Sequence, residues 1–240
     1  MTPQASILLA ISLMLTPAGG TPAGNEEGTP LRLPLIPPAE QVHGLPLTKV
    51  LSKVGSRVKG GYVLFGVEVA LRGGKEPTIS LSDKGGADLG TALREILSQI
   101  PDYEMHVISA HLIEILPRRA RTDPKDLLNL RIATFSVTNT PAASILAHPA
   151  RFIPELQARL KPRAALGTRP VQVYSGPFAL SGSEVTLHLQ NVSVRQILDA
   201  VSEATGSLGT GQQRFGWACK LRSDDTKGVP KHTWQALPGR

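Results

Sequence analysis

Apolar and polar positions along this chain follow two different periods, and the changes between them outline its secondary structure. Apolar residues at helical spacing predict helices over residues 46–59 and 88–99, and a third that is capped by Asn191 or Ser193 and ends at Gly206. Alternating or continuously apolar runs bounded by turn residues predict strands. These strands cover residues 62–71, 78–82, 103–109, 112–116, 185–189 and 215–221.

The order of these elements predicts an α+β fold built from two small strand–helix–strand modules. In the first module, Asp88 is a good N-cap for the central helix, and Pro101 ends that helix. The helix of the second module can be laid over the first so that Leu89 matches Val194 and Leu93 matches Leu198. A duplication would explain this overlay, but apolar spacing alone would also produce it.

Between the modules lies a stretch with weaker patterns. We expect a strand over residues 127–137, a short helix over 151–160 interrupted near Pro154, and a loop from Lys161 to Gly176. The resulting division is a signal peptide (1–24), a linker (25–43), a first module (44–117), a basic Pro- and Gly-rich connector with this strand and short helix (118–180), a second module (181–222) and a polar tail (223–240). We expect this tail to be mobile, with packing of Trp234 against the modules as the alternative.

The N-terminus carries nine apolar residues, Ile7–Leu15, followed by small residues. This run is too short to cross a bilayer as a helix, which takes about 20 residues. It fits the apolar region of a secretory signal, with Ala18 and Gly20 at suitable positions before a cleavage site, although no Lys or Arg precedes it. We therefore expect a periplasmic or secreted protein. The alternatives are a buried N-terminal helix and a misassigned start.

Charge is distributed unevenly along the 240 residues, whose formal net charge is +7. Ten basic and three acidic residues lie between Pro117 and Arg169, while the rest of the chain is balanced. Such a patch attracts anions such as lipid head groups or polysaccharides, or it keeps a linker solvated. Aromatic residues make up 4% of the chain, which argues against nucleic-acid binding by stacking. The candidate anion-binding residues are Arg118, Arg119, Arg121, Arg159, Lys161 and Arg163.

No motif for catalysis or metal binding is present. The six histidines show no HExxH or comparable spacing, and we interpret His106 and His188 as residues on exposed strand faces. No Gly-x-Ser-x-Gly motif occurs. Cys219, the single cysteine, lies in an apolar predicted strand, and we interpret it as a buried structural thiol. We therefore predict no catalytic residue, no metal and no cofactor, and a protein that is not an enzyme.

The run LHLQNVSVRQILDAVSEATG within 185–206 resembles the short N-terminal module of secretins and TonB-dependent receptors. The likeness consists of an alternating strand, an Asn-Val-x-Val segment, and a helix with paired aliphatic residues that closes with Thr-Gly. Across most of the chain, the order of segments also resembles uncharacterised exported proteins of acidobacterial type. The matching segments are Gly61–Glu68, Asp126–Leu130, Phe152–Leu156 and Val185–Gly206. These resemblances imply a fold and an exported location, and no chemistry.

Together these features predict a non-catalytic exported protein that contacts another protein of the cell envelope as a scaffold or accessory module. Small strand–helix–strand modules have open sheet edges that can accept a strand from a partner. The alternative is binding of anionic lipid or polysaccharide through the connector, and an exported hydrolase is a third possibility. We expect no nucleic-acid partner and no transmembrane segment in the mature chain.

Overall fold

The computed structural model describes residues 33–35, 42–59, 61–71, 75–82, 88–160, 183–206, 214–222 and 231–239. It has mixed helices and strands, which confirms the α+β class. The first elements are β1 (Val42–Pro46), α1 (Leu47–Gly55), β2 (Leu64–Leu71), β3 (Thr78–Leu81), α2 (Leu89–Gln99), β4 (Tyr103–Val107) and β5 (Leu112–Pro117). The later elements are η1 (Leu127–Asn129), β6 (Arg131–Pro141), α3 (Ala142–Ala147), η2 (Pro149–Arg151), α4 (Pro154–Leu160), β7 (Glu184–Ser193), α5 (Val194–Gly206), β8 (Arg214–Arg222) and β9 (Lys231–Gly239).

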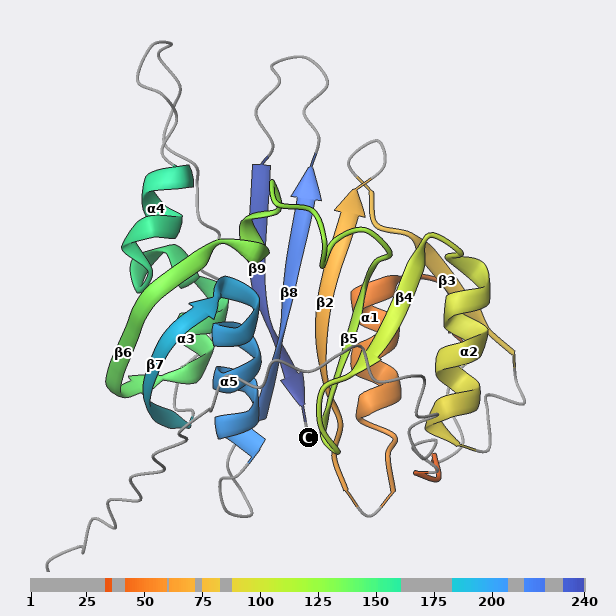
Figure 1. The fold of residues 1–240 in the computed structure, drawn as a ribbon. Helices are drawn as coiled ribbons and strands as arrows, with labels where there is room; N and C mark the ends of the chain where they lie inside the picture. The colour runs from red at the N-terminus through yellow and green to blue at the C-terminus, as the bar shows by residue number, and fades with distance from the viewer. Residues whose placement is uncertain are drawn as a thin grey trace, which may run out of the picture.

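A five-stranded sheet runs through the middle of the molecule in the order β4-β5-β2-β8-β9 (Figure 1). Its centre is parallel, because β2 pairs in parallel with β5 on one side and with β8 on the other. The outer strands close antiparallel hairpins, β4 with β5 and β8 with β9. The strands of the two expected modules therefore belong to one continuous sheet.

The two faces of this sheet support two separate hydrophobic cores. On β2, Phe65, Val67 and Val69 point into the first core with α1 and α2, while Trp217 and Cys219 of β8 point into the second core with α3 and α5. A two-stranded sheet lies over each helix pair, β1-β3 over the first and β6-β7 over the second. The result is a stack of five layers: ribbon, helices, central sheet, helices, ribbon.

Both halves repeat the same order of elements. β1–α1 and β3–α2–β4–β5 in the first half correspond to β6–α3 and β7–α5–β8–β9 in the second. The match extends to backbone detail: β1 and β6 each have a register shift near their end and a residue with positive φ, Gly44 (58°) or Asn139 (44°). Two residues later each strand ends in proline, Pro46 or Pro141, and its helix begins at once. These shared details support a duplication more strongly than the apolar overlay does.

Several predicted elements are confirmed. Asp88 caps α2, with its side chain accepting a hydrogen bond from the Thr91 N–H at 2.8 Å. The two helices over 46–59 and 88–99 and the strands of both modules form close to the expected bounds. Ser193, one of the two expected caps, precedes α5 directly.

The connector and the tail differ from the prediction. The connector contains the expected strand and short helix, as β6 and α4, but these and α3 carry residues of the second core, among them Phe135 and Leu156, so this part of the chain is not a separate linker. The tail contains a strand that was not predicted, because Lys231–Gly239 forms β9 and pairs with the whole of β8, and Trp234 packs against the second core. At the other end, packing begins before the expected Gly44: Leu35 is buried and bridges to Val58 within the range assigned to the linker.

The middle of the chain also needs finer corrections. Residues 127–129 form a 3-10 turn before β6 rather than the start of a strand. The helix α3 was not predicted, because its six residues are too few to display a helical period. The expected signal peptide and the loop 161–176 lie outside the described residues.

Candidate functional site

A buried charge cluster joins the two halves of the molecule across the central sheet. Arg195 of α5, 4% exposed, donates to Glu68 of β2 at 2.9 Å and to Asp126 at 3.3 Å. Its other terminal nitrogen lies 3.7 Å from Glu114 of β5, which is fully buried. Arg121 approaches Glu114 from the surface and donates two hydrogen bonds to it. We call these residues, together with Asp199, the Arg195 cluster.

Asp199 extends the cluster one turn along α5. It accepts a hydrogen bond at 2.9 Å from the indole N–H of Trp217, which is itself fully buried on β8. The Arg195 guanidinium lies 6.0 Å from the centre of the same indole ring. The cluster therefore connects β2 and β5 of the first half to α5 and β8 of the second.

The protonation of the cluster is set by its burial. Burial raises the pKa of Glu68 to about 7, and repulsion from Asp126 adds to this rise, while Arg195 opposes it. Burial likewise raises the pKa of Asp199 to about 8, and the charge of Glu114 adds to that rise. Protonation of Glu68 and Asp199 lowers the number of negative charges that face Arg195 and Arg121.

The carboxylates of the cluster are shielded from solvent. The side chains of Glu68, Glu114 and Asp126 are 4%, 0% and 6% exposed. Removing one partner from a buried ion pair leaves an uncompensated charge, which makes such a cluster a specific link between elements. We therefore interpret it as a structural link between the two halves.

Sequence reasoning missed this cluster, although a signal was present. Glu68 interrupts the apolar run of β2 and Glu114 interrupts that of β5, and both strands are buried on both faces. A charged residue in such a strand requires a buried partner. The identity of that partner, Arg195, could not be read from the pattern, because it lies 127 positions away from Glu68.

The outer edge of the sheet at β4 has a different character. No strand of the described part of the chain pairs with the side of β4 that faces away from β5. The Ile108 N–H donates to the Leu112 carbonyl, so the alternation of an antiparallel ladder turns the N–H and C=O groups of Met105 and Val107 outward. Val107 and Ile108 are 55% and 36% exposed, the large apolar side chains that the described part of the chain leaves most open.

A cavity of about 300 Å³ opens beside this hairpin tip, at the end where β2 and β5 begin. The ring of Tyr62 stacks on that of His111, with centroids 4.4 Å apart, and Arg214 lies over the Tyr62 ring at 4.1 Å. The cavity walls also include Leu64, Leu112 and Glu203. It provides a partly apolar surface next to Val107 and Ile108.

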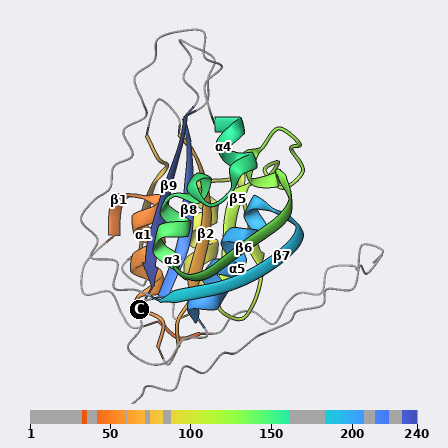
Figure 2. The same ribbon diagram turned by 90° about the vertical axis from the view of Figure 1, so that its left-hand side faces the viewer.

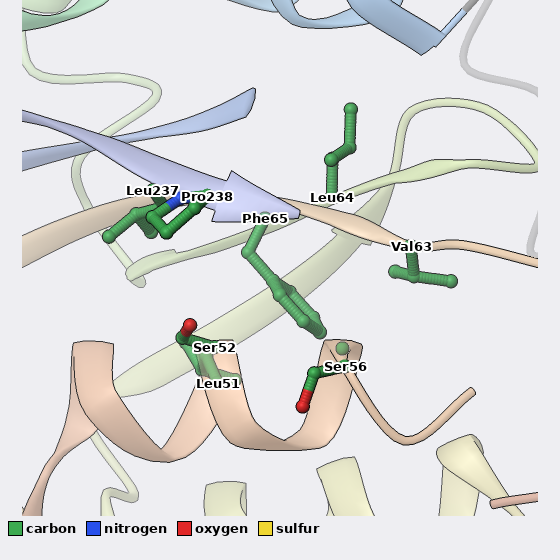
Figure 3. A pocket seen from close by; sticks show the side chains of 9 residues that line it. Leu51, Ser52, Ser56, Val63, Leu64, Phe65, Leu237 and Pro238 are labelled. Atoms are coloured by element: carbon green, nitrogen blue, oxygen red, sulfur yellow. The ribbon is translucent and has the colours of Figure 1, made fainter. Parts of the chain in front are cut away.

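A second hollow, between α1, β2 and the end of β9, is much smaller. Figure 3 shows Phe65 pointing from β2 toward α1, whereas Leu64 points to the opposite side of the sheet, with Leu237 and Pro238 at the rim. Its volume of about 10 Å³ is enough for one water molecule. It cannot hold a small-molecule ligand.

The structure describes four of the six candidate anion-binding residues. Arg118, Arg119 and Arg121 follow β5 directly, whereas Arg159 lies on α4 next to η2. Arg118 donates to the Pro101 carbonyl and Arg121 is paired with Glu114, so both already have partners. Lys161 and Arg163 lie outside the described residues.

The remaining chemistry-bearing residues are dispersed. Cys219 is buried, as expected, and burial raises the pKa of its thiol well above the usual range. His188 lies on an exposed strand face and shares a 2.8 Å hydrogen bond with Ser136 opposite it on β6. His106, which is partly exposed, bonds to Glu104 at 2.9 Å. In the described ranges no group of three or more His, Cys, Asp or Glu residues could hold a metal ion.

Comparisons with protein-family models, with characterised proteins and with solved structures found no match for this chain. No helix in the described part of the chain is long and apolar enough to cross a membrane.

Proposed function

We propose that this chain is a non-catalytic binding module of the cell envelope that takes up an extended segment of a partner protein on the outer edge of β4. The observation that carries the proposal is the open edge of β4, with outward backbone groups at Met105 and Val107 and exposed apolar side chains at Val107 and Ile108. Native proteins usually blunt such an edge with charge or proline.

Strand addition fits the rest of the site. Main-chain hydrogen bonds provide affinity in this mode of recognition, and pockets for individual side chains provide selectivity. The Tyr62–His111 cavity at the end of β4 is a suitable pocket of this kind. A location in the envelope rests on the expected signal peptide and on the resemblance of residues 185–206 to the module of secretins and receptors.

A selection from a phage-displayed library of random peptides on the immobilised chain tests the proposal. We expect the selected peptides to carry apolar residues at alternate positions and to bind equally well in low and high salt, because screening weakens charge contacts more than strand pairing. Binding lost at high salt would instead favour the arginines after β5.

Position 107 offers a matched pair of variants. Val107→Pro removes one outward N–H and should weaken peptide binding about tenfold, the equivalent of one lost backbone hydrogen bond. Val107→Thr has nearly the same size and keeps the N–H, so its binding should change little. Equal affinities of the two variants would contradict strand addition at β4.

A further inference from the structure

We infer that the outer edge of β9 is a second acceptor edge, and that its ligand is a partner segment lying parallel to β9 with apolar side chains on both faces. This inference goes beyond the binding at β4 and rests on a separate observation, the incomplete repeat of the two halves.

The repeat assigns an equivalent to each strand of the central sheet. The hairpin β4–β5 follows α2, and the hairpin β8–β9 follows α5, so β9 corresponds to β5. In the first half, the strand after α1 is β2, which pairs in parallel with β5 on the side that faces away from β4. A strand in the same relation to the second half would pair in parallel with the outer side of β9.

That place is empty among the described residues. After α3 come η2 and α4, and no described strand pairs with the side of β9 that faces away from β8. In Figure 2, which looks onto this side of the molecule, β9 lies between α1 and α3. Both helices contact β9, α1 from the side of the first core and α3 from the side of the second, so the strand edge lies between them.

The side chains of β9 next to this edge are only partly covered. Trp234 on the α3 side is half-buried, and its indole nitrogen is buried without a hydrogen-bond partner in the described structure. Gln235 is exposed, and Leu237 packs against the first core with α1. A segment placed here would cover Trp234 and bring carbonyl acceptors close to the strand edge.

The chemistry of the ligand follows from β2, which fills the equivalent place. Its residues from Leu64 to Val69 are buried, because helices cover both faces of the sheet at that position. A segment between α1 and α3 meets a helix on each side as well. We therefore expect apolar residues in succession rather than the alternation that suits an exposed edge.

The orientation of the backbone identifies a position for a test. Proline within a sheet is confined to positions whose nitrogen faces away from the neighbouring strand. Pro238 pairs with Phe215 of β8, so its backbone faces outward, and the alternation gives Ala236 and Trp234 the same orientation. Ala236→Pro should therefore remove a donor from the outer edge and leave the ladder to β8 intact, while Ala236→Ser keeps the donor.

The experiment uses a synthetic peptide of residues 62–71, the β2 segment, with lysines added at both ends for solubility. We expect the peptide to bind the full chain and to slow hydrogen exchange over residues 232–238. Ala236→Pro should weaken this binding at least about tenfold. Ala236→Ser should bind as the unmodified chain does, and so should Val107→Pro, which alters the other edge.

Three other results of this experiment would each overturn the inference. Slow exchange at Trp234 and Ala236 without peptide would show that the chain's own residues already fill the edge, which overturns the proposal of a partner segment. Protection confined to β4 would overturn the second acceptor edge while supporting the function proposed above. No protection at either edge would overturn this inference, and the peptide selection at position 107 would still test β4 independently.

Discussion

At the scale of single residues, the contact between Gly66 and Trp217 determines how closely β2 and β8 can pack. The two residues are partners in the parallel ladder, and the indole ring lies against the glycine. A Cβ atom at Gly66 would lie 2.7 Å from the nearest ring atom, closer than atoms in proteins pack. The ring in turn holds Asp199 of the Arg195 cluster through its N–H.

We predict that Gly66→Ala lowers the free energy of unfolding by about 1–3 kcal/mol, since the added methyl group displaces a fully buried ring. Urea unfolding followed by tryptophan fluorescence measures this change. Gly61→Ala is the matched control, because a Cβ atom there meets nothing within 4 Å, and its effect should stay within about 0.5 kcal/mol. Equal effects of the two substitutions would contradict the packing argument.

At the scale of elements, the start of α5 positions the Arg195 cluster. The Ser193 hydroxyl accepts a hydrogen bond from the Gln196 N–H at 3.2 Å, and the Gln196 side chain accepts one from the Ser193 N–H at 2.8 Å. This reciprocal pair is a capping box, and it fixes the first turn of the helix. Arg195 lies in that turn, so the cap orients the guanidinium toward Glu68.

Loss of this cap should be measurable. We expect Ser193→Ala to destabilise the protein by about 1 kcal/mol, whereas Ser193→Asp, which keeps a side-chain acceptor, should retain most of the stability. The midpoint of urea unfolding provides the comparison. A Ser193→Ala protein as stable as the unmodified chain would mean that packing alone begins α5 at Val194.

At the scale of the whole molecule, the two halves share one sheet and are linked by the Arg195 cluster. Glu68 and Asp199 keep their protons in the folded protein up to a pKa of about 7 and about 8, whereas in the unfolded chain they ionise near pH 4. Between these limits the folded state binds more protons than the unfolded state. Stability therefore falls as pH rises through this range and levels off above it.

We predict that the free energy of unfolding decreases by about 6 kcal/mol between pH 5 and pH 8, since each pKa unit corresponds to about 1.4 kcal/mol and both groups titrate in this range. The double variant Glu68→Gln/Asp199→Asn, which carries neutral side chains of similar shape, should flatten this dependence. Asp88→Asn is the control: its hydrogen bond from Thr91 lowers the pKa of Asp88, so its titration lies below this range. Stability that rises toward pH 8 would contradict the assignment.

Local chemistry explains which elements could be predicted from the sequence. The caps at Asp88 and Ser193, the period of α2 and the hairpin turn at Ser109–His111 depend on residues within a few positions of one another. Helix α3 is too short for such a signal, and β9 depends on its pairing with β8. The sequence predicts open sheet edges in general. It does not identify β4 as such an edge, because that depends on the order of the strands in the central sheet.

The sequence by itself determined the local elements, the α+β class and the uneven distribution of charge, because each of these depends on residues that are close together along the chain. The tertiary structure decided the rest. Parallel pairing of β2 with β8 joins residues about 150 positions apart, such as Gly66 and Trp217, and merges two expected modules into one sheet. Burial then brings Glu68, Asp126 and Arg195 together. No local pattern specifies such contacts, because they arise from the order in which strands join the sheet.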